Sequence, residues 1–258
     1  MSEFVSRPLR LPPAFQLKSY ETLGSTMDQA RSLAEQGAED GTLVWAQQQS
    51  GGRGRLGRQW VSPKGNLYLS LVLRPQCRAT EAAQLGFIAA LAIGEAIGSV
   101  APPMDITYKW PNDVLLNGRK VSGILLESRG REMELDYLVL GCGINIASFP
   151  KAANYPATSL RFEGLPASVT VEDLLEAFCR YFLSWTNRWL DEGFAPVREA
   201  WLRHAARRNE EIDVRLAKET FSGVYRDIDI DGQLVLELPD GQYRRVASGE
   251  VFPPDLPN

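Results

Sequence analysis

The chain has 258 residues, 44% of them hydrophobic and 23% charged, with a formal net charge of -4. This length suits one large domain plus a small one, and the acidic balance argues against a nucleic-acid-binding scaffold. Because the sequence shows no signal peptide and no apolar run of about 18 residues, we expect a cytoplasmic protein that binds neither nucleic acid nor a membrane.

The first half of the chain alternates predicted strands and helices. Short apolar or alternating runs predict strands at 15–20, 42–46 and 66–73. A helix is predicted between Thr26, which forms a capping-box pattern with Gln29, and Gly37, which stands where a helix C-terminus belongs. A second helix, 80–100, has apolar residues on all sides and is expected to be deeply buried.

The next part of the chain consists of strands joined by short turns. Strands are predicted at 106–110, 114–116, 121–127 and 135–146. Asn117-Gly118, between the second and third of these, is a type I′ hairpin signal. A long connection containing three prolines then runs from residue 147 to 168.

Two helices and a change of composition complete the chain. The helices are predicted at 170–190, where Thr170 and Asp173 form a capping box, and at 195–206. Short alternating strands follow at 212–216, 220–228, 233–238 and 243–247. This order predicts an α+β protein, in which a mixed sheet with packed helices precedes a small all-β module.

One loop combines glycines and arginines in an unusual density. Within residues 52–58, Gly52, Gly54 and Gly57 alternate with Arg53, Arg55 and Arg58. Glycines allow close backbone approach and arginines bind carboxylates and phosphates, so the pattern favours a mobile loop that closes over an anion. The alternative is a solvated basic loop. The segment matches G-x-G-x-x-G, but a strand follows it where a dinucleotide fingerprint needs a helix, and no P-loop pattern is present.

Two further motifs carry candidate functional residues. Lys109-Trp-Pro-Asn-Asp113 places a lysine at a strand end beside a tight corner. An ordinary surface lysine is equally compatible with this pattern. In Gly141-Cys-Gly-Ile-Asn145, the glycines interrupt a strand and indicate close approach of a ligand or backbone. The alternative there is a β-bulge, with Cys142 simply a small buried residue.

Histidine and cysteine usage narrows the chemistry. His204 is the only histidine and is expected on a helix surface, which disfavours Ser-His-Asp and Cys-His hydrolases. Cys77, Cys142 and Cys179 are far apart and indicate neither a disulfide framework nor a CxxC metal site. Electrostatic stabilisation of anions, as in phosphoryl or adenylyl transfer, fits the remaining residues.

Taken together and in order, these motifs resemble those of the biotin–protein ligase family, also called biotin–[acetyl-CoA-carboxylase] ligases. The resemblance covers roughly residues 17–250 and rests on Ser25-Thr26, Gln49, the 52–58 loop, Lys109–Asp113, Gly118–Ile124 and Gly141–Asn145. It implies a class II synthetase-like catalytic domain at 15–208, followed by an SH3-like barrel at 209–258. It also implies that biotin and ATP, with Mg²⁺, form biotinyl-5′-AMP and pyrophosphate. The biotinyl group would then pass to a lysine of the biotin carboxyl carrier domain of acetyl-CoA carboxylase or a related carboxylase.

The resemblance also assigns roles to residues of this chain. It makes Lys109, Arg53 and Arg55 catalytic. The implied biotin contacts are Ser25, Thr26, Met27, Gln49, Gly52, Arg53, Gly54, Arg55, Lys109, Gly123, Gly141 and Gly143. The implied ATP contacts are Arg55, Arg58, Trp60, Lys109, Asn112 and Asn145, with Trp60 near the adenine; metal ligands are not assigned. Met27 departs from the family's usual Asn, and Leu56 stands where many members have a basic residue.

Alternatives to a biotin ligase remain open at this point. A lipoate–protein ligase shares the fold and the adenylation chemistry, and a non-catalytic biotin-binding or carrier-docking protein is a second possibility. Because only about fifteen residues precede the first strand, too few for a winged helix-turn-helix, we expect a ligase without a DNA-binding domain. A homodimer is also compatible with the family resemblance.

Overall fold

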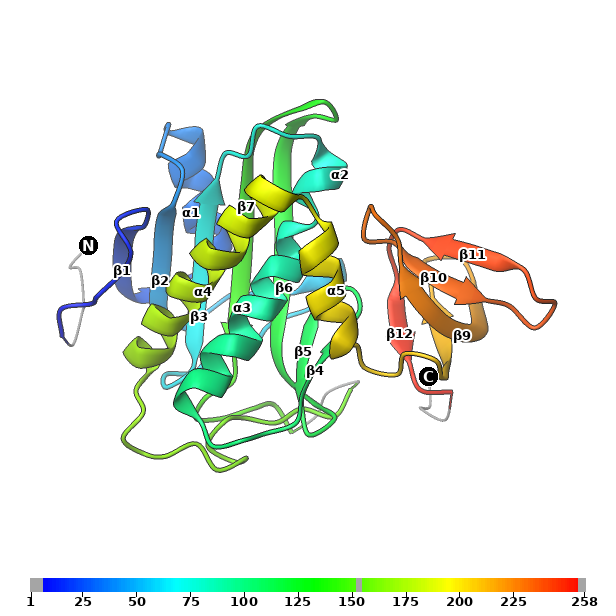
Figure 1. Cartoon of the computed structure of the whole chain (residues 1–258). Coiled ribbons are helices and arrows are strands. Elements are labelled where there is room, and N and C mark those ends of the chain that lie inside the picture. Colours follow the sequence, from blue (N-terminus) through cyan, green and yellow to red (C-terminus); the bar gives the residue numbers. More distant parts are fainter. Residues whose placement is uncertain (1–6, 152–154, 255–258) are drawn as a thin grey trace.

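The structure, a computed structural model, describes residues 7–151 and 155–254 (Figure 1). It contains a seven-stranded sheet with helices on both faces and a separate five-stranded sheet at the C-terminal end. Three residues of the predicted connection, 152–154, and the last four of the predicted barrel, 255–258, lie outside the described residues. The α+β class and the mixed sheet with packed helices are confirmed.

The larger sheet has the strand order β1-β2-β3-β7-β6-β5-β4. The strands are β1 (Gln16–Leu23), β2 (Thr42–Gln49), β3 (Leu67–Leu73), β4 (Ile106–Lys109), β5 (Asp113–Leu116), β6 (Arg119–Arg131) and β7 (Glu134–Ile144). Only β1 and β2 pair in parallel; every other neighbouring pair is antiparallel. All seven residues of β3 are buried, because helices cover both faces of the sheet where it runs.

Helices cover the two faces unequally. Four helices, α2 (Ala79–Ala82), α3 (Leu85–Val100), α4 (Val171–Glu192) and α5 (Ala195–Arg203), lie on the side of the sheet nearest the viewer in Figure 1. The opposite face carries α1 (Thr26–Glu35), which packs on β2, β3 and β7. Among the described residues, α1 leaves β6, β5 and the Gly143 end of β7 uncovered on that face, and the candidate site lies there.

The predicted helix 80–100 is in fact two helices, α2 and α3, separated by a tight turn at residues 83–84. By length and composition the segment could cross a membrane. Its apolar residues are instead buried against the sheet and α4, so packing inside the protein accounts for its composition.

Helix ends test three of the capping predictions. Gly37 adopts φ +87° after α1, and Thr170 and Asp173 form the predicted box at the start of α4. The capping box predicted for Thr26 and Gln29 is wrong. Ser25 is the N-cap residue and makes no capping bond, while the Thr26 side chain turns toward Gln49 on β2.

The C-terminal module is an antiparallel sheet with the order β11-β10-β9-β8-β12. Its strands are β8 (Glu211–Arg215), β9 (Thr220–Ile228), β10 (Leu234–Glu237), β11 (Tyr243–Val246) and β12 (Glu250–Phe252). The first four were predicted. β12 was not predicted, because three residues are too few to show an alternating pattern.

Candidate active site

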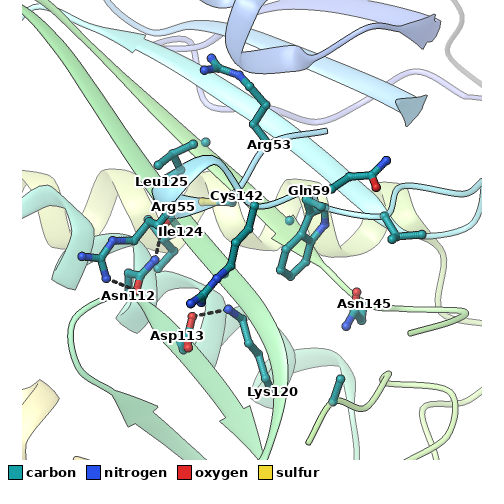
Figure 2. A pocket seen from close by; sticks show the side chains of 18 of the residues that line it. Arg53, Arg55, Gln59, Asn112, Asp113, Lys120, Ile124, Leu125, Cys142 and Asn145 are labelled. Atoms are coloured by element: carbon teal, nitrogen blue, oxygen red, sulfur yellow. Dashed lines mark hydrogen bonds and ion pairs between the residues drawn. The ribbon is translucent and has the colours of Figure 1, made fainter. Parts of the chain in front are cut away.

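A track of glycines forms the floor of the site. Gly141, Gly143 and Asn145 follow one another at every second position of β7 and the residue just beyond it, so they face the same side of the sheet. The register places Gly143 directly beside Gly123 of β6. The cavity above this floor has a volume of about 420 Å³ (Figure 2).

The glycines allow two side chains to lie directly on the sheet. A Cβ atom at Gly143 would overlap the indole ring of Trp60, and one at Gly123 would lie 3.1 Å from that ring. A Cβ atom at Gly141 would overlap the thioether of Met27. The β-bulge alternative for this motif is wrong, since β7 pairs with β3 and β6 without a register shift at these positions.

One end of the cavity is lined by neutral polar groups. The Thr26 backbone N–H and hydroxyl both donate to Gln49 Oε1, at 2.7 and 3.1 Å, and the Ser70 hydroxyl donates to Thr26 Oγ1 at 2.9 Å. The hydroxyl of Ser25 is buried and has no hydrogen-bond partner among the described residues. A buried polar atom of this kind is expected to bind a ligand atom or water.

The other side of the cavity holds two lysines that share one carboxylate. Lys109 Nζ lies 2.9 Å from Asp113 Oδ2, and Lys120 Nζ lies 2.6 Å from Asp113 Oδ1. Burial by itself would raise the pKa of Asp113, but the two ammonium groups outweigh it and lower the pKa to about 2. The cluster therefore carries one surplus positive charge. The side chain of Lys109 is only 11% exposed, so the surface-lysine alternative is wrong.

The depressed pKa of Asp113 has a consequence for acid stability. The carboxylate stabilises the fold at any pH above its ordinary pKa of 3.8, and that contribution is lost as the pH falls through about 2. The contribution is about 2 kcal/mol for a shift of this size. We expect the free energy of unfolding to fall more steeply between pH 4 and 2 in the wild type than in Asp113→Asn. The exposed Asp191→Asn is the control, and an equally steep fall in Asp113→Asn would contradict the prediction.

The three arginines of the glycine–arginine loop, residues 52–58, are all held by other parts of the protein. Arg53 is paired with Asp28 of α1 and Glu127 of β6, both at 2.9 Å. Figure 2 shows its side chain directed away from the Asp113–Lys120 pair. Because these carboxylates compensate its charge, Arg53 anchors the loop to the sheet and α1.

The other two arginines connect the loop to the C-terminal module. Arg55 donates to Asn112 Oδ1 at 3.1 Å and to the Gly249 carbonyl at 3.2 Å, while Arg58 forms a bidentate ion pair with Glu250. Burial lowers the pKa of Arg55 from its ordinary value. Arg55 is therefore withdrawn from solvent in this conformation, whereas residues 56–58 are exposed and Leu56 forms the tip of the loop with φ +56°.

All but one of the residues assigned from the sequence line this single cavity. They are Ser25, Thr26, Met27, Gln49, Arg53, Gly54, Arg55, Arg58, Trp60, Lys109, Asn112, Gly123, Gly141, Gly143 and Asn145. The exception is Gly52, which does not line the cavity. A Cβ atom at Gly52 would lie 2.9 Å from the side-chain amide of Gln49. Trp60, expected near the adenine, lies on the glycine floor.

Several lining residues received no role from the sequence. Lys120 and Asp113 belong to motifs that were recognised, but nothing in the spacing shows that they meet across the β5–β6 hairpin. Tyr155, Glu250 and Phe252 come from the long connection and the C-terminal module. Because these residues are far along the chain from the motifs, no local sequence pattern predicts that they line the cavity.

The cavity is a poor preformed metal site. Among residues 7–151 and 155–254, no three His, Cys, Asp or Glu side chains are grouped as metal ligands. The carboxylates that line the cavity, Asp113 and Glu250, are already paired with lysine or arginine. A Mg²⁺ ion required by the reaction would therefore have to arrive with the nucleotide phosphates.

Comparisons with known proteins agree with this geometry. Residues 11–203 match the biotin/lipoate A/B protein ligase family, and residues 209–252 match the biotin protein ligase C-terminal domain. Among curated relatives, the chain is 42% identical to the biotin–[acetyl-CoA-carboxylase] ligase of Paracoccus denitrificans, over 88% of this chain and 96% of that protein. It is 32% identical to the bifunctional ligase/repressor BirA of Bacillus subtilis, over 90% of this chain and 72% of that protein.

Solved structures show the same fold. The biotin protein ligase from Aquifex aeolicus in complex with biotin and ATP has a TM-score of 0.78 and 27% identity, covering 92% of this chain and 97% of that one. The chain therefore belongs to the biotin/lipoate A/B protein ligase family. Within this family it is a biotin protein ligase, since it has the C-terminal domain match and its similarity to biotin–[acetyl-CoA-carboxylase] ligases extends over most of its length.

Proposed function

We propose that this chain adenylates biotin with MgATP, releases pyrophosphate, and transfers the biotinyl group to a lysine of a biotin carboxyl carrier domain. The carrier would belong to acetyl-CoA carboxylase or a related carboxylase. In this proposal residues 15–208 form the catalytic domain and 209–258 an SH3-like barrel, and the enzyme works in the cytoplasm. Homodimer formation, which the family resemblance suggests, belongs to the same proposal.

The observation that carries the proposal is the division of the cavity into three zones. Neutral polar groups (Ser25, Thr26 and Gln49) form one zone, and the glycine floor with Trp60 forms an apolar middle. The lysine pair and the loop arginines supply a cationic zone. Biotin has a neutral ureido group, an apolar ring and chain, and a carboxylate, so its parts correspond to the three zones in order.

The cationic zone explains how the anhydride could form without a general base. The biotin carboxylate and the ATP triphosphate repel each other, and positive groups are needed where they meet. Lys109 and Lys120 supply a net positive charge beside Asp113, and Arg55, which donates to neutral acceptors, adds a second. The charge of Arg58 is compensated by Glu250. We assign Lys109 and Arg55 to the reaction, with Lys120 as a further cation of the same zone. Arg53, which the family resemblance makes catalytic, would contribute by anchoring the loop through Asp28 and Glu127.

The neutral polar zone distinguishes biotin from lipoate. The dithiolane ring of lipoate has no N–H or carbonyl group to meet the buried Ser25 hydroxyl or the Thr26–Gln49 pair. Leaving such groups unpaired in a closed site disfavours the wrong substrate strongly, by about 10⁴-fold in favourable cases. The site therefore favours a biotin ligase over a lipoate ligase.

Pyrophosphate release separates the candidate functions. The purified chain with MgATP should release pyrophosphate when biotin is added and far less when lipoate is added. An apo carrier domain should then become biotinylated, while a carrier whose acceptor lysine is replaced by arginine should not. Release with lipoate alone would indicate a lipoate ligase. Biotin binding without any pyrophosphate would indicate a non-catalytic binding protein.

A further inference from the structure

Lys109, one of the two lysines of the cationic zone, is carried by an edge strand. β4 is the last strand of the seven-stranded sheet and pairs with β5 on one side only. Lys109 ends this strand and points into the cavity, while its neighbours Tyr108 and Trp110 are buried away from it. The position of Lys109 therefore depends on what fixes the outer edge and the opposite side of β4.

The segment leading to the C-terminal module closes the outer edge. The Tyr108 N–H donates to the His204 carbonyl, and the Ala206 N–H donates to the Tyr108 carbonyl, both at 2.8 Å. These bonds add a short parallel bridge to β4. The edge strand of the site is thus held by the residues that immediately precede the module.

A turn of the C-terminal module fixes the side of β4 that lies opposite the Lys109 side chain. Residues 229–233, the β9–β10 turn, reach the larger domain, and the Gly232 carbonyl accepts a hydrogen bond from Trp110 Nε1 at 3.0 Å. The Gln84 side chain donates to the Ile230 carbonyl, also at 3.0 Å. Trp110 is only 1% exposed, so its indole N–H has no access to bulk water as an alternative partner.

The turn is also seated on an aromatic cluster that leads back to β4. A Cβ atom at Gly232 would lie 2.7 Å from the ring of Phe87. Phe87 packs edge-on against Trp201 with ring centroids 5.3 Å apart, and Trp201 stacks on Tyr108 at 5.9 Å. Gly232 is therefore linked to both neighbours of Lys109, to Trp110 directly and to Tyr108 through two rings.

We propose that the β9–β10 turn is a positioning device for the Lys109–Asp113 corner, with Gly232 and Trp110 as its positioning residues. The inference rests on the proposed function and deepens it. The module would raise the rate of biotin adenylation by keeping the two lysines and their shared carboxylate at fixed positions in the cavity. The neutral polar zone lies at the start of α1 and on β2 and β3, whereas the turn bonds to Gln84 and Trp110, so binding of the biotin ring system would not depend on it.

The chain provides a matched pair of substitutions for a test. Gly232 and Gly241 both follow an aspartate in hairpin turns of the module, with φ of +79° and +80°. An alanine at either position meets the same backbone strain, but only the one at Gly232 would collide with Phe87; Gly241 has no atom within 4 Å. Trp110→Phe is the second variant; it keeps an aromatic ring but removes the N–H donor together with part of the indole volume.

Kinetics below the unfolding temperature should separate positioning from folding. We expect Gly232→Ala and Trp110→Phe to lower kcat for biotin-dependent pyrophosphate release roughly tenfold per folded molecule, while the Kd for biotin changes less than about threefold. Gly241→Ala should match the wild type in both quantities. Wild-type kcat in folded Gly232→Ala and Trp110→Phe would overturn the inference.

Hydrogen exchange tests the same inference without reference to activity. The Tyr108 amide should exchange faster in Gly232→Ala than in Gly241→Ala, because the strand edge would open more often. Equal exchange in the two variants would also overturn the inference. A wild-type protein that releases no pyrophosphate with biotin would instead count against the proposed function, and the exchange result would still decide the role of the turn.

Discussion

Lys109→Met and Lys120→Met are each expected to slow biotin adenylation by about two to three orders of magnitude, the loss expected when a charge-assisted contact in a closed site is removed. The physical reason is the charge balance around Asp113. Two ammonium groups face one carboxylate, so removing either lysine leaves a neutral pair and no surplus charge for the biotin carboxylate and the α-phosphate. Methionine reproduces the unbranched apolar stem of lysine without the ammonium group, so the packing should be largely retained.

The same charge balance predicts a rescue. In the double variant Lys109→Met/Asp113→Asn, the remaining Lys120 is no longer neutralised, and part of the adenylation rate should return. Lys64→Met serves as the control, since Lys64 is half-exposed and pairs with Glu21 outside the cavity. The measurement is single-turnover formation of biotinyl-AMP. Single lysine variants with near-normal rates would remove these lysines from the mechanism, and a double variant no faster than Lys109→Met would show that net charge is not the controlling quantity.

Arg55→Gly is expected to release biotinyl-AMP at least about tenfold faster than the wild type, while slowing its synthesis less. Arg55 joins the glycine–arginine loop to Asn112 and to the Gly249 carbonyl of the C-terminal module. Without these bonds the glycines favour an open loop, since ordering costs about 1–2 kcal/mol per residue fixed. A closed loop also keeps the reactive anhydride away from water and stray amines.

The outcome can be measured as escape of labelled biotinyl-AMP and as labelling of lysines on a bystander protein. Arg58→Gly is a useful comparison, because its ion pair with Glu250 fixes the other end of the same 3₁₀ turn, Arg55–Gly57. If Arg55→Gly retains the intermediate as long as the wild type and labels no bystander, the loop does not act as a latch.

Local patterns were sufficient for most elements and for the motifs. The all-round apolar composition of residues 80–100 correctly predicted burial, and the Asn117-Gly118 turn has the positive φ values, +50° and +72°, that its hairpin type requires. The box at Thr170 formed although Arg7 also pairs with Asp173, because Arg7 binds Oδ1 and leaves Oδ2 for the N–H and hydroxyl of Thr170. At Thr26 the same kind of pattern failed, because Gln49, distant in sequence, offers the hydroxyl and the N–H a better-placed acceptor.

The residue types and spacings by themselves determined which chemistry this protein could carry: anion binding by glycines, arginines and lysines, in a mixed-sheet fold with a small β module. Only the tertiary structure decided how those residues act together. Sheet register set Gly123 beside Gly143, so that Trp60 can lie on the floor, and it brought Lys120 and Lys109 to one carboxylate. Docking of the C-terminal module then brought Glu250 and Gly232 to the site from more than a hundred residues away along the chain. Such contacts depend on strand pairing and packing between distant segments, and neither leaves a periodic trace in the local sequence.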